Sequence, residues 1–239
     1  MVNLGMTTFL LSINRRLVLP SISFLTAQRY NYNMTSFYKV QQNEKADVII
    51  MSKRNAMHWP NLLKKSKIMY KLRLVGSLLY ENIADEINYN EFFQKFEMED
   101  TFLSWFLITE VHIWMMALRI MQEEEHGLVL RNHLIEAMWN DVKIRSKKLG
   151  IINTKVMNQQ LELLSQQFNA SLVGYDDAIF SNDTLLANHI WTRFFNKKTT
   201  NPVQLEQLVK YIRKQVNLLS KTKTADIFSI NPSVAWISL

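Results

Sequence analysis

The sequence predicts an all-α fold: a single helical bundle-like domain, with an N-terminal targeting segment and a short extended C-terminal tail. Its 239 residues include only 5 glycines and 4 prolines, and no proline stands between Pro60 and Pro202. Few turn residues are therefore available, which disfavours an all-β sandwich. Apolar residues recur every three or four positions instead, which is the period of an α-helix with one buried face.

Three segments carry this helical period. Their apolar positions are Leu130, Leu134, Met138 and Val142, then Met157, Leu161, Leu164, Phe168 and Leu172, and finally Leu205, Leu208, Ile212, Val216 and Leu219. Before the third segment, Asn201 and Pro202 supply an N-cap and a proline at the first helical position, and Gln204 can complete a capping box. Gly127, Gly150 and Gly174 each follow a periodic stretch, which predicts helix ends.

Residues 101–121 are apolar on nearly all sides, which fits either a membrane span or the central helix of a bundle. Glu110 and His112 fall in the middle of this stretch, and a charge there is costly in a bilayer. We therefore expect a central helix. In it Glu110 either pairs with an Arg or Lys of another helix or lines a groove, and His112 is a hydrogen-bonded core residue. After the helices, residues 225–239 lack a period, and we expect an extended tail that Trp236 pins to the body.

The basic charge is concentrated in the first third of the chain. Residues 1–80 carry 12 Lys and Arg against 2 Asp and Glu, whereas residues 81–239 carry 16 against 19. A uniformly basic body for binding DNA is therefore not expected. Residues 1–43 contain no acid but include arginines and many hydroxyls, which is the composition of a mitochondrial transit peptide. A secretory signal and an ordinary disordered start are the alternatives.

These patterns divide the chain into residues 1–45 as a mitochondrial targeting or disordered segment, 46–80 as a basic amphipathic linker helix and 81–239 as the α-helical domain. In the linker, Lys64, Lys67 and Lys71 share one helical face. That face suits an anionic membrane surface or ribosomal RNA. The alternative is the solvated face of an ordinary helix.

No catalytic constellation stands out in the sequence. It has no cysteine and no HExxH or GxSxG pattern, and its glycines are too far apart for a phosphate-binding loop. The Glu123-x-x-His126 spacing matches half of a di-iron site, but a second half is missing, so a solvated helix end is preferred. Asp176-Asp177 is best explained as a charge pair beside a helix start. We expect no catalytic residue, no bound cofactor and no metal.

Several short blocks follow one another in residues 78–236. They are Trp105-Phe106-Leu107, His112-Ile113-Trp114, Met138-Trp139-Asn140-Asp141-Val142, Leu149-Gly150, Val173-Gly174-Tyr175-Asp176, Trp191-Thr192-Arg193-Phe194-Phe195-Asn196, Tyr211-Ile212-Arg213-Lys214-Gln215 and Val234-Ala235-Trp236. In this order the blocks resemble the ubiquinol–cytochrome c reductase complex chaperone family, the mitochondrial cytochrome b assembly chaperones.

This resemblance implies a helical, non-enzymatic assembly factor of respiratory complex III on the matrix side of the mitochondrial inner membrane. The implied partners are newly made cytochrome b, a small second assembly factor, the mitochondrial ribosome and, peripherally, the inner-membrane surface. A runner-up from another class is a helical mitochondrial enzyme or carrier with a site around Glu110 and His112.

The candidate partner-binding residues lie in two of the resembling blocks. They are Trp139, Asp141, Tyr175 and Asp176. Asn140 stands where the family pattern has an acid, so Asp141 lacks a neighbouring carboxylate. We expect Trp139 to lie mostly in the core. If Gly174 ends its helix, Tyr175 and Asp176 begin the next connection and lie at the edge of a partner-binding surface.

Overall fold

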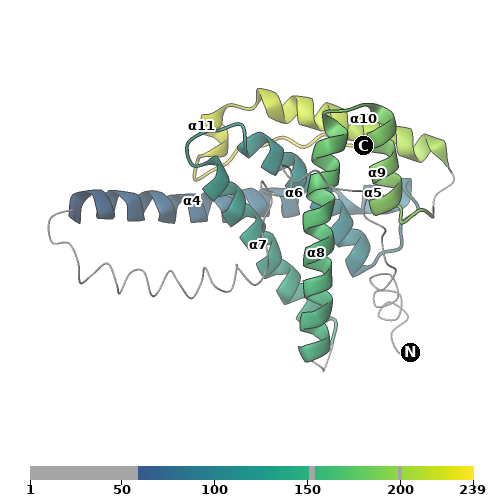
Figure 1. Ribbon diagram of the computed structural model, residues 1–239, viewed down its shortest axis with the longest axis horizontal. Coiled ribbons are helices and arrows are strands. Elements are labelled where there is room, and N and C mark those ends of the chain that lie inside the picture. The colour runs from purple at the N-terminus through teal and green to yellow at the C-terminus, as the bar shows by residue number, and fades with distance from the viewer. Residues whose placement is uncertain (1–58, 151–153, 199–200) are drawn as a thin grey trace.

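The computed structural model describes residues 59–150, 154–198 and 201–239, in which packed α-helices are joined by short connections (Figure 1). In chain order these are α4 Trp59–Glu86, α5 Tyr89–Lys95, α6 Phe102–Ile120, α7 Gly127–Lys148, α8 Thr154–Ile179, α9 Asp183–Arg193, α10 Pro202–Lys221 and α11 Thr224–Ile227. The described part contains no strand, so the predicted all-α class is confirmed. The predicted targeting segment lies outside the described residues.

Helix α6 is the centre of the bundle and contacts α4, α5, α7, α8 and α10. It begins where the Thr101 hydroxyl accepts a hydrogen bond from the Ser104 amide at 3.2 Å. By length and composition α6 could cross a membrane, but 89% of its apolar window is buried inside the protein. The expectation of a central bundle helix is therefore confirmed.

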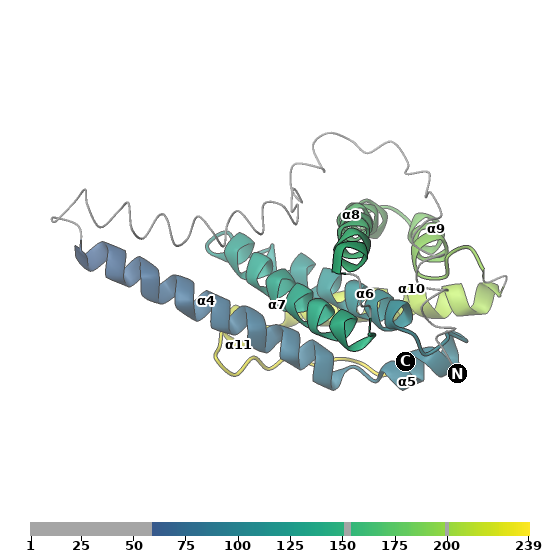
Figure 2. The ribbon, with the colours of Figure 1, turned by 90° about the horizontal axis from the view of Figure 1, so that it is seen from below.

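The other helices cover α6 from several sides. Helices α4, α7 and α6 pack side by side, with α8 and α9 as a pair beside them (Figure 2). Helix α10 packs on both α6 and α9. Helix α4 runs without a break through residue 80, so the expected boundary between linker and domain falls inside one helix. The side chains of Leu72, Val75 and Leu79 on α4 are buried in the common core.

Two of the expected helix ends are found. Gly150 follows α7 with a φ of 75°, a left-handed conformation that costs glycine little. At the start of α10, the Asn201 side chain accepts from the Val203 amide at 3.0 Å, and Pro202 is the first helical residue. The Gln204 side chain donates to Glu97 at 3.2 Å, which links α10 to the turn after α5.

The other two glycine predictions are wrong. Gly127 begins α7 rather than following a helix, and Gly174 lies inside α8, which continues to Ile179. Glycine is required at position 174 by the close packing of α8 against α9 and not by a turn, because a Cβ there would lie 2.5 Å from Nδ1 of His189 on α9. A close helix crossing and a helix end both favour glycine, and the sequence alone does not separate them.

The expected C-terminal tail is confirmed, with one addition. The short helix α11 comes first, and residues 228–239 then contain no helix. The indole N–H of Trp236 donates to Asn82 Oδ1 on α4 at 2.9 Å. The pinning role expected for Trp236 is therefore found, and it joins the last part of the chain to the first described helix.

The crossing of α4 and α7 depends on the missing side chain of Gly76. A Cβ on Gly76 would lie 2.8 Å from the carbonyl carbon of His133 and 2.9 Å from the Leu134 amide nitrogen. Both are backbone atoms of α7, which cannot move away as a flexible side chain could. Glycine at this position lets the two helix backbones approach each other.

Replacing Gly76 by alanine tests this packing through the sign of its effect. Gly→Ala inside an ordinary helix stabilises by about 0.5–1 kcal/mol. Here we expect Gly76→Ala to lower the free energy of unfolding by about 1–3 kcal/mol, as overpacking does. Urea denaturation measures the change, and Ser77→Ala on the next position is the control, expected within about 0.5 kcal/mol of wild type. A more stable Gly76→Ala variant would contradict the close crossing.

Candidate functional site

A buried ion pair lies in the middle of α6, where the sequence places its least favourable charge. Glu110 is fully buried. Its Oε2 contacts the Nη2 of Arg193 on α9 at 2.5 Å, and its Oε1 accepts from Arg193 Nε at 2.8 Å. Of the two expectations for Glu110, pairing with a cation from another helix is therefore confirmed. The planar guanidinium suits this two-point contact because its donors match the spacing of a carboxylate.

The pair extends into α8. The Ser171 hydroxyl donates to Glu110 Oε1 at 2.7 Å, and Arg193 Nη1 donates to Gln167 Oε1 at 3.0 Å. Three helices thus meet at one carboxylate, and the bonds compensate for the cost of burying both charges. Glu110 is occupied by protein groups on both oxygens and is not available to a substrate.

His112 occupies the same central helix and is also fully buried. Its Nδ1 lies 2.7 Å from the Ile108 carbonyl, so Nδ1 carries the proton and donates. Its Nε2, 2.8 Å from the Tyr211 hydroxyl on α10, then accepts from that O–H. Burial lowers the pKa of His112 to about 4, so the ring is neutral at neutral pH. It is the hydrogen-bonded core histidine expected from the sequence.

The four candidate partner-binding residues are not brought together on one surface. Trp139 is buried against Phe106 and Phe168, which confirms its expected core position. Asp141 is half-buried on α7, where it accepts from the Tyr80 hydroxyl at 2.6 Å and from Arg145 Nε at 2.8 Å. It joins α7 to α4.

The expected surface position of Tyr175 and Asp176 is wrong. Tyr175 is fully buried, with its ring stacked on Trp114 at 4.9 Å between centroids. Asp176 is buried beside it and accepts from the Trp114 indole N–H at 2.8 Å. Both face the core because α8 continues past Gly174. Asp176-Asp177 also does not stand at a helix start, and Asp177 alone is exposed. A partner-binding role for the two buried residues stays a prediction, which their burial does not support.

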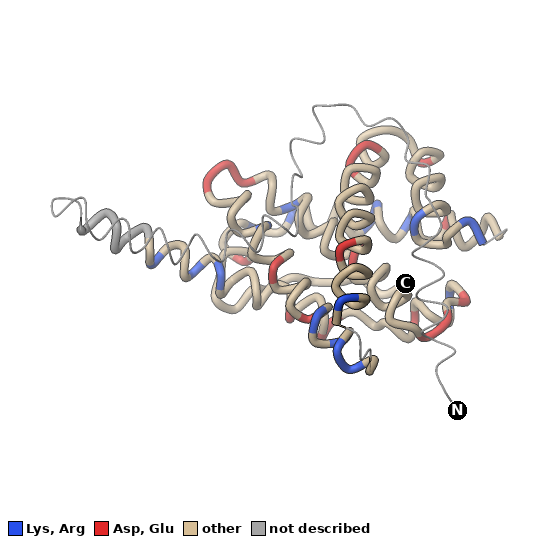
Figure 3. The backbone as a smooth tube through the Cα atoms, turned by 60° about the horizontal axis from the view of Figure 1, so that its bottom comes forward, with Lys and Arg blue, Asp and Glu red and all other residues tan. Residues whose placement is uncertain are grey.

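The lysine face of α4 is described in part. Lys67 and Lys71 are exposed, as are Arg73 and Tyr70, whereas the side chain of Lys64 lies outside the described set. This end of α4 extends away from the other helices and carries several basic positions (Figure 3). Basic residues beside an exposed tyrosine are typical of surfaces that contact anionic lipid.

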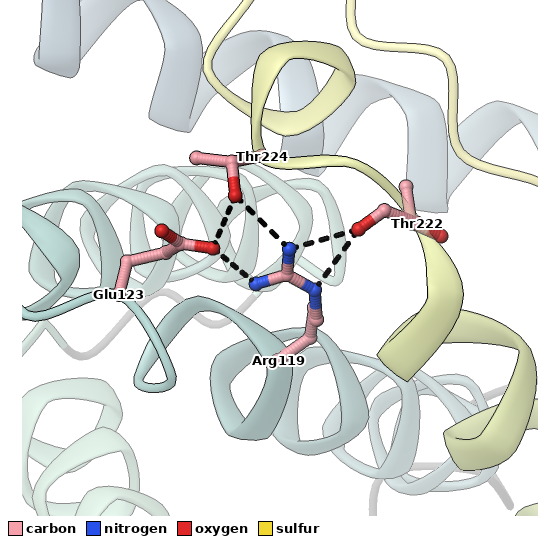
Figure 4. Close-up of polar contacts among 4 residues, drawn as sticks. All are labelled: Arg119, Glu123, Thr222 and Thr224. Carbon is pink, nitrogen blue, oxygen red and sulfur yellow. Dashed lines mark hydrogen bonds and ion pairs between the residues drawn. The ribbon is translucent and has the colours of Figure 1, made fainter.

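A network of hydrogen bonds around Arg119 at the end of α6 is not predicted from the sequence (Figure 4). The Arg119 guanidinium donates to the Thr222 carbonyl at 2.8 Å and to Glu123 at 2.7 Å. The Thr224 hydroxyl donates to the same Glu123 oxygen at 2.6 Å. Thr224 and Arg119 hold the pKa of Glu123 below its usual value. Glu123 thus links α11 to α6.

Among the described residues, no cluster of His, Asp and Glu could hold a metal ion.

Comparison with known proteins places these residues in a family. Residues 94–236 match the family model described as ubiquinol–cytochrome C chaperone. The chain belongs to this family. The match includes Glu110, Arg193, the Trp114–Asp176 pair and the tail as far as Trp236.

The curated relatives carry related names. The chain is 46% identical over 173 residues to ubiquinol–cytochrome c reductase complex assembly factor 1 of Drosophila melanogaster, covering 71% of this chain and 66% of the relative. It is 35% identical over 181 residues to the Homo sapiens protein of that name, covering 76% and 59%.

A more distant relative is the mitochondrial protein CBP3 of Saccharomyces cerevisiae, 25% identical over 155 residues, covering 64% and 46%. The chain therefore spans about half to two thirds of the length of these relatives. No solved structure matches.

The Glu110–Arg193 pair can be tested by breaking one side of it. We expect Glu110→Ala to lower the free energy of unfolding by about 3–5 kcal/mol, because Arg193 would remain buried without a counter-charge. The double variant Glu110→Met with Arg193→Met removes both charges, and we expect it to recover most of that loss. Denaturant titration of wild type, the double variant and the single variants Glu110→Met and Arg193→Met closes the cycle and gives the coupling energy. Additive losses in the double variant would show that the two residues do not act as a pair.

Asp176 and Asp177 form a matched pair for testing the corrected position. We expect Asp176→Ala to cost about 1.5–3 kcal/mol, since it removes a charged acceptor from the buried Trp114 indole. Asp177→Ala, one residue further on and exposed, should change stability by less than about 0.5 kcal/mol. Melting temperatures and urea curves measure both. Small stability changes of equal size in the two variants would contradict the buried position of Asp176.

The buried histidines predict a pH dependence of stability. Burial lowers the pKa of His112 to about 4, and burial beside Arg193 lowers that of His189 to about 4. The unfolded chain binds these protons at about pH 6.5, so the folded state loses stability as pH falls from about 6.5 towards 4. Each histidine contributes a slope of up to about 1.4 kcal/mol per pH unit. Urea titrations between pH 5 and 7 should show a shallower slope for His112→Gln, and an unchanged slope would contradict the assignment.

Proposed function

We propose that this protein is a non-enzymatic assembly factor for ubiquinol–cytochrome c reductase, respiratory complex III, and acts in mitochondria. The family match over residues 94–236 carries the proposal. The names of the fly and human relatives refer to assembly of that complex, and the name of the yeast relative to mitochondria. The acid-free first 43 residues suit import into that compartment.

The finer form of the proposal concerns partners. We infer that the protein binds newly synthesised cytochrome b, supports its translation and insertion, and works with a small second assembly factor. It would stand near the mitochondrial ribosome, peripherally on the matrix side of the inner membrane. The exposed basic end of α4, with Lys67 and Lys71, supports contact with a polyanionic surface, either lipid headgroups or ribosomal RNA.

The enzyme or carrier alternative around Glu110 and His112 gains no support from the geometry. Glu110 is bonded to Arg193 and Ser171, and both ring nitrogens of His112 are bonded to protein groups. A general acid or base must reach its substrate within hydrogen-bond distance. Neither buried group can do so without dismantling the centre of the bundle.

Affinity purification of the tagged full chain from mitochondria tests the assembly role. We expect cross-linking and mass spectrometry to recover cytochrome b, one small partner and mitochondrial ribosomal proteins. An unrelated tagged matrix protein is the control. Depleting the protein should lower the amount of assembled complex III on native gels. Normal complex III after complete depletion would contradict the proposal.

The basic end of α4 is tested by charge reversal. We expect Lys64→Glu, Lys67→Glu and Lys71→Glu together to reduce flotation with anionic vesicles or pelleting with ribosomes. Circular dichroism should stay unchanged, because exposed charges such as those of Lys67 and Lys71 add little to stability. Wild-type association should also weaken as salt rises. Reversal of the exposed Lys147, Lys148 and Lys223 changes net charge equally and is the control. Equal loss in both variants would show that net charge, not the α4 face, is responsible.

A further inference from the structure

The tail, residues 228–239, is the one described segment that lies on the bundle in extended form rather than as a helix. After α11 it runs back beside α4 towards α5 (Figure 2). Val234 is buried, and Trp236, Ile237 and Leu239 pack against the core. In the described part of the chain, the backbone amides of Phe228 and Ser233 in this tail donate to the carbonyls of Thr224 and Asp226, which both belong to α11. Its hydrogen bonds to α4 and α10 are made by side chains of those helices.

The side chain of Gln215 on α10 hydrogen-bonds to the backbone of the tail. The side-chain Nε2 of Gln215 donates to the Ala235 carbonyl at 2.9 Å, and the backbone amide of Ile237 donates to the side-chain Oε1 of Gln215 at 3.0 Å. Gln215 is fully buried. Its carboxamide thus bonds to an extended strand as a neighbouring β-strand would, with one donor and one acceptor. Such a contact recognises backbone and does not depend on which side chains the strand carries.

Trp236 supplies the side-chain selectivity of the same contact. Its N–H donates to Asn82 on α4 at 2.9 Å. Its ring meets the His112 imidazole of α6 edge-to-face at 5.2 Å. His112 in turn contacts Phe92 on α5 and Tyr211 on α10. Asn82 on α4 therefore gives the indole one polar acceptor, and His112 on α6, backed by Phe92 and Tyr211, gives it one aromatic wall.

We propose that the groove under the tail, formed by Asn82, His112 and Gln215, is a peptide-binding site that the chain's own tail occupies in cis. Backbone recognition by a buried amide combined with one selective side-chain pocket is how proteins bind extended peptides. Its occupant after release of the tail is an extended segment of a partner polypeptide with the tail's own chemistry. That chemistry is a tryptophan directly followed by one aliphatic residue and preceded by another two positions earlier.

The attachment of the tail decides how the site opens. A tethered segment acts at an effective concentration of millimolar order, so a free peptide at micromolar concentration does not displace it. Removing the indole from the tail weakens the cis contact and leaves Gln215 and Asn82 in place. A peptide that still carries the tryptophan then competes successfully.

The test uses the full chain and a fluorescein-labelled peptide of residues 229–239. Fluorescence anisotropy should show that Trp236→Ala protein binds this peptide at least about tenfold more tightly than wild type does. A peptide with Trp236→Ala should not bind. Adding Gln215→Leu to the Trp236→Ala protein should weaken binding about tenfold or more, since the paired amide contact is lost.

Two controls keep the result decisive. Ile230→Ala removes an exposed apolar residue of the same tail, and this protein should behave as wild type. If Trp236→Ala protein fails to fold, wild type is titrated into the millimolar range while hydrogen exchange is followed at Ile237, whose protection should fall as peptide replaces the tail. No binding to either protein overturns the proposal. A wild-type dimer that dissociates on Trp236→Ala also overturns it, because the groove would then hold the tail of a second copy.

Discussion

The positions of α8, α9 and α10 follow from the need to satisfy the polar groups of α6. This 19-residue helix is so apolar overall that packing alone would leave its rotation and its neighbours poorly specified. Glu110 fixes both, because an unpaired carboxylate at the centre of the bundle would cost several kcal/mol. Arg193 from α9 and Ser171 from α8 meet it there. In the same way His112 requires Tyr211 on α10, so these two residues of α6 together specify three partner helices.

This constraint also explains why a helix with the composition of a membrane span belongs to a bundle. Glu110 and Arg193 lie 83 residues apart, and Arg119 and Thr222 are 103 apart. The polar groups of α6 are therefore satisfied only after the later helices are present. Until then α6 exposes both its apolar surface and an unpaired carboxylate. The stability of the central helix is thus a property of the whole described domain, and not of the segment itself.

Features that arise from a local pattern are predicted correctly from the sequence. The prediction fails where one residue type, such as glycine, suits two different structural roles. The helical stripes, the Asn201 cap, the left-handed Gly150 and the pairing of Glu110 all follow from period, capping or charge burial. A glycine at position 174 fits a helix end and a close helix crossing equally well. Because a helix end was predicted there, Tyr175 and Asp176 were wrongly predicted to lie at the surface. Arg193 stands beside Phe194 and Phe195, a signal of burial that could have named the partner of Glu110. Gln215 and Thr222 gave no local signal, because their partners are set by tertiary contact.

Contacts between residues far apart in the sequence also join the first described helix, α4, to the C-terminal tail, and these contacts meet at one aromatic cluster. Trp236 is bonded to Asn82, 154 positions earlier, and touches His112, whose other contacts include Phe92 and Tyr211. His112 is therefore both a support of α6 against α10 and one wall of the groove that holds the tail. A group used in this way must stay neutral, and burial holds its pKa at about 4. Two kinds of contact therefore meet at His112. The hydrogen bond to Tyr211 holds two helices of the bundle together, whereas the contact with Trp236 holds the tail, which in our proposal a partner peptide replaces.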